Sequence, residues 1–189
     1  MSISKTTVLG TVSKDAWCVY ADGFRRAAEI LMDNVNTTYE VNTVCFPIIA
    51  LIRHYVELTL KEIIAYGQYL DDHNVKQGGH DIKNLWAVAR SYTRKHLKEL
   101  SKEEEAIIET FVDELYVLDP TSETTRYPCV KEKGALGKRD RSFADGQVWI
   151  NFDEWKIKVD RTKKIFDKIT MSLSVFEDLK SEFIAEHLP

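Results

Sequence analysis

The chain has 189 residues, and only twelve of them are glycine (eight) or proline (four), about half the average share of these turn-forming residues. A β sandwich or barrel needs a turn roughly every 8 to 12 residues, so the composition argues against those folds and favours a few long helices in one domain, residues 1–189. The formal net charge of −4 argues against a chain that attracts polyanions as a whole, and it is too small for a disordered acidic tail.

Two helices are predicted in the first seventy residues. Ser13 is a candidate cap for a helix that runs to about Asp33, with apolar residues at helical spacing. Pro47 is suited to the first turn of a second helix, which continues to about Leu70. Apolar residues occur on nearly every side of segment 48–64, so this second helix is expected to be the central, most buried one.

A third and a fourth helix follow a loop over residues 71–79. Asp81 is a candidate cap for the third helix, which is expected to end near Leu100. Ser101 with Glu104 forms a capping box, which starts a fourth helix that Pro120 stops. The fourth helix is strongly acidic, so it is expected either to repel RNA or to meet a basic partner.

Residues 119–150 are predicted to form a long loop or a small β-hairpin insertion that ends in the segment QVWINF. Asn151 or Asp153 then caps a last helix that runs to about His187. The apolar stripe of this helix is longer than one short bundle layer can cover, so part of it is expected to pack on a second subunit. The sequence therefore predicts an all-α bundle of about five helices that forms a homodimer.

Neither a membrane segment nor a cofactor is expected. The longest apolar run, FPIIALI, is far too short to span a bilayer, and the amino terminus lacks the pattern of a secretory signal. The cysteines, Cys18, Cys45 and Cys129, show no paired spacing and are typical of buried thiols in a reducing cytosol. No metalloprotease, hydrolase or dinucleotide motif is present, and His73 lacks further ligands at zinc spacing. A cytoplasmic protein without metal or cofactor is predicted.

The segment RHYVELTLK, residues 53–61, places four ionisable groups in the most hydrophobic helix. Arg53, Glu57 and Lys61 are spaced four residues apart, and His54 lies three residues before Glu57, so all four can share one broad face. One interpretation is an internal ion-pair network that holds the helices in register. The other makes Arg53 and His54 a phosphate-binding and acid/base pair, with Glu57 in the site and Lys61 as a binding residue.

Two further segments carry candidate binding residues. GHDIKNLW places His80 and Asp81 at a helix start, where they either bind an anion or act as a cap and a helix-end contact. LDPTSETTRYP contains Asp119 and Arg126, which can reach back to the charged face of the second helix. Arg126 next to Tyr127 either holds a phosphate or closes the loop.

Four blocks together carry a family resemblance: A-D-G-F-x-x-A-A-x-x-L, F-P-I-x-x-L-I-R-H-Y-x-E-L-x-L-K, G-H-D-I-x-x-L-W and L-D-P-x-S-x-x-x-R-Y-P. Over roughly residues 16–128 the chain resembles uncharacterised bacterial proteins related to HEPN domains. The resemblance implies a compact helical bundle that dimerises. It also implies either a metal-independent endoribonuclease of toxin–antitoxin and phage-defence systems or a catalytically silent binding module.

The catalytic signature of the family is an Arg followed, after four to six residues, by a His, usually in the final helix. Here the final helix has Arg161 but no His before His187. The literal match is Arg90 to His96 on the third helix, where six positions at ~100° each leave the side chains ~120° apart. The block residues Arg53, His54 and Arg126 are therefore at least as good catalytic candidates.

Two functions are expected from these observations. In the first, the protein is a dimeric endoribonuclease in which a His acts as general base toward a 2′-hydroxyl and an Arg stabilises charge on the phosphate. In the second, it is a noncatalytic helical dimer that binds a protein partner, such as an antitoxin or another defence component. RNA is a partner in the first alone.

Overall fold

The computed structural model describes residues 17–73, 79–122, 125, 130–131, 139–140 and 150–187 of the chain. These residues form an all-α bundle, so the predicted fold class is confirmed. The described helices are α1 (Trp17–Asn34), α2 (Thr38–Leu70), α3 (Ile82–His96), α4 (Lys102–Leu118) and α5 (Phe152–His187).

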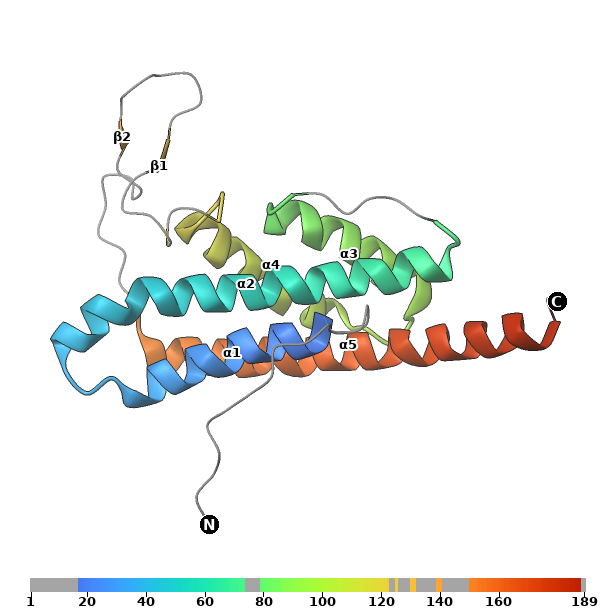
Figure 1. Cartoon of the computed structure of the whole chain (residues 1–189), viewed down its shortest axis with the longest axis horizontal. Coiled ribbons are helices and arrows are strands. Elements are labelled where there is room, and N and C mark those ends of the chain that lie inside the picture. Colours follow the sequence, from blue (N-terminus) through green and yellow to red (C-terminus); the bar gives the residue numbers. More distant parts are fainter. Residues whose placement is uncertain are drawn as a thin grey trace, which may run out of the picture.

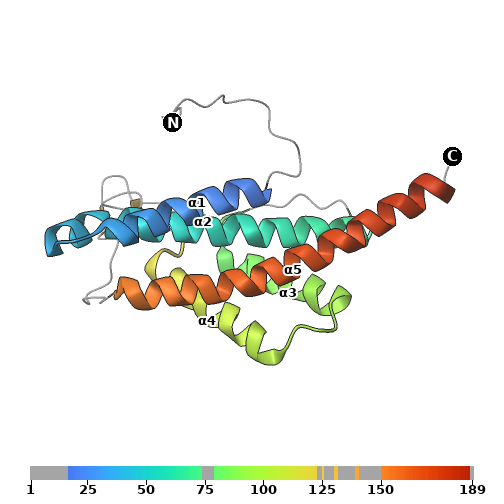
Figure 2. The same cartoon turned by 90° about the horizontal axis from the view of Figure 1, so that it is seen from below.

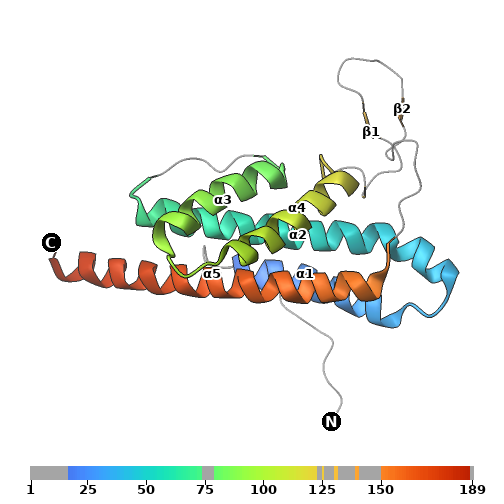
Figure 3. The same ribbon diagram turned by 180° about the vertical axis from the view of Figure 1, so that it is seen from behind.

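Helix α2 is the central element, as its apolar sequence predicts. Its neighbours are α1, α3 and α5, while α4 packs mainly on α3 and α5. Figure 1 shows α1, α2 and α5 running lengthwise, and Figure 2 shows α3 and α4 together on one side of α5. The carboxyl-terminal turns of α5 reach past the ends of the other helices, which is clear from behind in Figure 3. The core is therefore built around α2, and one end of α5 extends beyond the bundle.

The start of α2 differs from the prediction. The helix begins at Thr38 and not at Pro47, which lies inside it. The side chain of Thr37 accepts a hydrogen bond from the Glu40 backbone, and the Glu40 carboxylate bonds back to the Thr37 backbone. This reciprocal capping box fixes the start nine residues earlier than proline preference suggests. The T-x-x-E pattern was present in the sequence and outweighs the signal from the proline.

The other predicted caps are confirmed where the structure describes them. Asp81 accepts hydrogen bonds from the Lys83 and Asn84 backbones, and Asn151 accepts from Asp153 and Glu154. Ser101 and Glu104 form the expected capping box. The third helix ends at His96, four residues before the predicted Leu100. Ser13, the predicted cap of the first helix, lies outside the described residues.

Within the predicted insertion, the structure describes two short strands, β1 (Val130–Lys131) and β2 (Arg139–Asp140). They pair antiparallel, with Val130 opposite Asp140. A small hairpin therefore lies in the segment where one is predicted. The proposed hairpin end in QVWINF falls on residues 147–152, of which only the last three belong to the described part of the chain.

Helices α2 and α3 approach each other closely at Gly67. A Cβ atom built on Gly67 would lie 2.2 Å from Cγ of Tyr92, so this position admits no side chain unless α3 moves. The close approach holds the second half of α3 against the end of α2, while the residue before Asp81 meets the charged segment of α2, where the candidate site lies.

Helix α2 is more apolar than its longest uninterrupted run suggests. One 18-residue window has a mean hydropathy of 1.4, so the helix is long and apolar enough to cross a membrane by length and composition alone. Half of that window is buried inside the bundle, and the core helix of a soluble protein satisfies the same criterion. The absence of a membrane partner stays a prediction.

Candidate functional site

Arg53 is the centre of the charged cluster on α2. Its side chain is 1% exposed, and its three guanidinium nitrogens have three different partners. Nε donates to the backbone oxygen of Asp119 over 2.8 Å, Nη2 to the backbone oxygen of His80 over 2.6 Å, and Nη1 to the Glu57 carboxylate over 3.1 Å. One buried side chain therefore connects α2 to the residue that follows α4 and to the segment that precedes α3.

Glu57 receives three cationic or polar donors. One oxygen accepts from Arg53, and the other accepts from Lys61 Nζ and from His80 Nδ1, each over 2.7 Å. Burial by itself would raise the pKa of Glu57, but the hydrogen bonds from Lys61 and His80 outweigh it and hold the pKa below its usual value. Because the ionised carboxylate only accepts hydrogen bonds, the proton of His80 must be on Nδ1.

This cluster joins residues predicted separately from two motifs. The spacing of Arg53, Glu57 and Lys61 places them on one face of α2, as expected from the sequence. His80 approaches that face because Asp81 caps α3 directly after it and Arg53 holds the His80 carbonyl. Of the two predicted roles, anion binding or helix capping, Asp81 has the capping role. Its carboxylate accepts hydrogen bonds from the backbone amides at the start of α3.

His54 lies apart from the cluster, contrary to the expectation that all four residues share one face. Its ring packs edge-on against Phe24 of α1, with the ring centres 4.3 Å apart. Successive residues of a helix point ~100° apart, so His54 is turned toward α1 while Arg53 is turned toward α3 and α4. Arg53 and His54 therefore do not form a joint phosphate-binding and acid/base pair.

The second candidate loop is described only in part. Asp119 is buried, and its carboxylate accepts a hydrogen bond from the Thr125 hydroxyl over 2.5 Å. Arg126 and Tyr127, predicted as catalytic and binding residues, lie outside the described residues.

Arg90 and His96, the literal match to the family motif, make hydrogen bonds to carboxylates within the chain. Arg90 donates to both carboxylate oxygens of Glu109 on α4, each over 3.2 Å. His96 Nε2 lies 3.0 Å from a carboxylate oxygen of Asp71, the residue that ends α2. The two side chains thus contact different elements, α4 and the end of α2, as their angular separation on α3 predicts.

The acidic residues of α4 are also paired within the chain. Glu105 and Glu109 bind Arg94 and Arg90 of α3, and Glu114 binds Lys158 of α5. Further bridges join Asp113 to Lys83 and Glu104 to Lys168. Helix α4 is therefore held between α3, which is basic, and α5, and most of its negative charge is already neutralised. The predicted free acidic face for RNA repulsion or a basic partner is much reduced.

His80 has the geometry of a general base. Its side chain is 64% exposed, although Nδ1 is fixed by the buried Glu57. A carboxylate that holds one imidazole nitrogen leaves the other available to take a proton from a substrate.

Among the residues that the structure describes, no group of three or more histidine, cysteine or acidic side chains is arranged to hold a metal ion.

A second buried glutamate, Glu62, was not singled out from the sequence. It lines a cavity of about 60 Å³ between α1, α2 and α5, together with Tyr55, Arg25 and Asp167. Burial and the nearby Asp167 raise the pKa of Glu62 to about 7. Only the occurrence of an acid within the apolar run of α2 could have signalled it. The residues facing Glu62 come from two other helices, which sequence spacing does not reveal.

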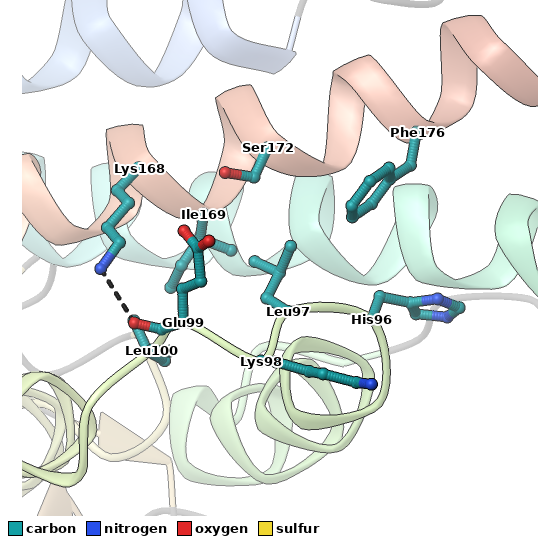
Figure 4. Close-up of a pocket in the computed structure, with 9 residues that line it drawn as sticks. All are labelled: His96, Leu97, Lys98, Glu99, Leu100, Lys168, Ile169, Ser172 and Phe176. Atoms are coloured by element: carbon teal, nitrogen blue, oxygen red, sulfur yellow. Dashed lines mark hydrogen bonds between the residues drawn. The ribbon is translucent and has the colours of Figure 1, made fainter.

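A larger groove lies between α5 and the connection from α3 to α4. It has a volume of about 390 Å³. Figure 4 shows Ser172 and Phe176 projecting from α5 toward this connection, where Leu97 lies. The groove walls combine apolar side chains with lysines at the rim, as in many protein-binding grooves.

Comparison of the chain with protein-family models, with curated proteins and with solved structures finds no match. The functional argument therefore depends on the residues and their geometry.

Proposed function

We propose that this chain is a HEPN-type helical protein that works as a noncatalytic homodimer. It would serve as a protein-binding or regulatory module of a bacterial toxin–antitoxin or defence system in the cytoplasm. The observation that carries the proposal is that Arg53 is buried and that each of its three guanidinium nitrogens donates to an acceptor within the chain. A guanidinium that is buried and in which each nitrogen donates to a protein oxygen is not available to a phosphate, but it holds three segments in register.

The other charged candidates support the same proposal. Arg90 and His96 pair with carboxylates on two different elements, and Asp81 occupies the amides where an anion would bind. A nuclease site needs cations that are free to meet phosphate. Among the described candidates, the cationic side chains Arg53, Lys61 and Arg90 form ion pairs within the bundle.

The test is incubation of the purified protein with total RNA in EDTA, combined with measurement of its mass in solution by light scattering. The proposal expects intact RNA and a dimer mass. RNA cleavage by the wild-type protein, lost on substitution of a candidate residue, would contradict it.

A second candidate function is a metal-independent endoribonuclease, which the Glu57–His80 pair specifically favours. In that reaction Nε2 of His80 takes the proton of a 2′-hydroxyl and the 2′-oxygen attacks the adjacent phosphorus. The bond from phosphorus to the 5′-oxygen breaks, and that oxygen takes a proton from water. The products are a 2′,3′-cyclic phosphate and a 5′-hydroxyl. His54 is a poorer base because its ring packs against Phe24.

Substitution of histidines separates the two functions. If the protein is an endoribonuclease, His80→Ala abolishes cleavage, whereas His73→Ala does not. His73 is the matched control because it is an exposed histidine in the loop after α2. Under the noncatalytic proposal, neither substitution changes the RNA, because the wild-type protein leaves it intact.

A further inference from the structure

The carboxyl-terminal half of α5 presents an uncovered apolar ridge. Its members are spaced four residues apart and are well exposed: Met171 (69%), Val175 (55%), Leu179 (56%) and Phe183 (60%). Such i, i+4 rows are the ridges by which helices most often pack on one another. Four large exposed apolar side chains in one row indicate a contact surface.

The opposite side of this segment is anchored to the bundle. Leu173 is fully buried, and Lys180 donates to the backbone oxygens of Tyr69 and Leu70 at the end of α2. The Ser181 and Tyr69 hydroxyls are 2.8 Å apart. Helix α5 is therefore held against α2 up to Ser181, and the ridge points away from the chain's own core.

The ridge is symmetric about Glu177. Met171 and Phe183 lie six residues to either side of it, and Val175 and Leu179 lie two residues to either side. When two copies of such a ridge meet antiparallel with Glu177 at the crossing level, each apolar residue lies at the level of an apolar residue of the other copy. Self-complementarity of this kind is what a two-fold interface requires.

The charges of α5 favour the same antiparallel arrangement. Segment 161–168 contains four basic residues and one acidic residue, whereas segment 177–186 contains four acidic residues and one basic residue. An antiparallel pair centred at Glu177 brings the acidic segment 177–186 of each copy to residues 168–177 of the other, which contain Lys168 and, apart from Glu177 itself, no acidic residue. Lys168 of one copy then lies at the level of Glu186 of the other. A parallel pair would place like charges together, which costs energy.

The groove beside the ridge has a matching occupant in this arrangement. Ser172, which lines the groove, and Phe183 are eleven residues apart, so at ~100° per residue they point within about 20° of each other. In an antiparallel two-fold pair, that side of one helix meets the same side of the other helix. Phe183 of the second copy therefore arrives at the level of Met171, one residue from Ser172, next to the groove of about 390 Å³.

We propose that two copies of this chain associate through an antiparallel α5–α5 contact centred at Glu177, with Phe183 of each copy inserted into the groove between α5 and residues 96–100 of the other. This inference rests on the homodimer of the proposed function and identifies its surface. Two apolar ridges and two filled grooves together supply the buried core that a stable interface needs.

The test is the dissociation constant of the full-length chain, measured by sedimentation equilibrium. Leu179→Glu, at the centre of the ridge, is expected to weaken the dimer at least 100-fold, and Phe183→Ala at least tenfold. Ile157→Glu is the matched control, because Ile157 is an equally exposed apolar residue of α5 outside the ridge (67%). It is expected to leave the dimer unchanged. Circular dichroism should show the same helix content for all three variants, since the substituted side chains are exposed.

Other outcomes overturn the inference in distinguishable ways. If the wild type is a dimer and Leu179→Glu is an equally stable dimer, the α5 contact is wrong while the dimer of the proposed function stands. If the wild type is a monomer at the highest concentration, both the α5 contact and the homodimer are wrong. If the wild type is a dimer that Leu179→Glu dissociates but it cleaves RNA in EDTA, the α5 contact stands and the noncatalytic function fails.

Discussion

Two buried glutamates of α2, five residues apart, have opposite electrostatic properties. Glu57 is 1% exposed and Glu62 is 6% exposed, yet the pKa of Glu57 is lowered and that of Glu62 is raised to about 7. Glu57 accepts hydrogen bonds from Arg53, Lys61 and His80, whereas at Glu62 burial is the largest cause of the shift and the like charge of Asp167 adds to it. Burial alone therefore does not decide the charge state of an acid, because the donors around Glu57 outweigh burial and those around Glu62 do not.

The two glutamates therefore affect stability differently: the network around Glu57 stabilises the fold, whereas ionisation of Glu62 destabilises it. On the Glu57 side, α2 is fastened to the ends of α3 and α4 by a satisfied network. On the Glu62 side, α2 meets α1 and α5 through an acid whose ionisation near neutral pH opposes folding. Neutralising each glutamate in turn should give effects of opposite sign.

The largest effect is expected for Glu57→Gln. The substitution leaves the Arg53 guanidinium buried without its counter-charge, which should lower the free energy of unfolding by about 3–5 kcal/mol. Urea denaturation at pH 7 measures the change, and Glu103→Gln, at an exposed position of α4, is the control. A Glu57→Gln variant as stable as wild type would contradict the stabilising role of this network.

A gain of stability is expected for Glu62→Gln at pH 8. The folded-state pKa of about 7 lies above the ordinary value of 4.5, so the folded protein disfavours the ionised acid above pH 7. The amide removes that penalty and should stabilise the protein by up to roughly 3 kcal/mol. Thermal unfolding at pH 8 checks this, and a lower melting temperature than wild type would count against it.

The pH dependence of the wild type should show both glutamates. Because its pKa is raised, the stabilising contribution of Glu62 is complete below pH 4.5 and is lost as the pH rises through 7. Because its pKa is lowered, the contribution of Glu57 is present above pH 4.5 and is lost as the pH falls through its folded-state value. In denaturation curves from pH 3 to 9, Glu62→Gln should remove the decline between pH 5 and 8 and keep the acid decline. Persistence of the neutral decline in that variant would assign it to another group.

The smallest effect is expected for His80→Ala. Glu57 keeps its bonds to Arg53 and Lys61, and the exposed His80 side chain is largely solvated, so the loss of stability should be below about 1 kcal/mol. Urea denaturation with His73→Ala as the reference measures it. A loss as large as that of Glu57→Gln would make His80 an essential part of the network around Glu57.

The sequence predicted much of the fold because its signals are local. The caps at Asp81, Ser101 and Asn151 depend on residues within one turn of each helix start, and a capping side chain acts on its own backbone. The early start of α2 was missed because Pro47 was given more weight than the Thr37–Glu40 box. Proline restricts a helix, whereas two reciprocal hydrogen bonds begin one.

The candidate site could be predicted only in part. The i, i+4, i+8 spacing correctly placed Arg53, Glu57 and Lys61 together, because that relation lies within one helix. The assignment of His80 to Glu57, and the turn of His54 toward Phe24, depend on which helices pack on which faces of α2. Neither follows from spacing along the chain.

The sequence by itself determined that this protein is a helical bundle with α2 at its centre, since composition and periodicity specify helices and the face that each one buries. Only the tertiary structure decided what the charges do. Hydrogen bonds between elements far apart in the chain made Arg53 a buried connection, and burial between helices, together with Asp167, raised the pKa of Glu62. The length of α5 beyond its neighbours left an apolar ridge uncovered. These outcomes depend on distances between residues far apart in the chain.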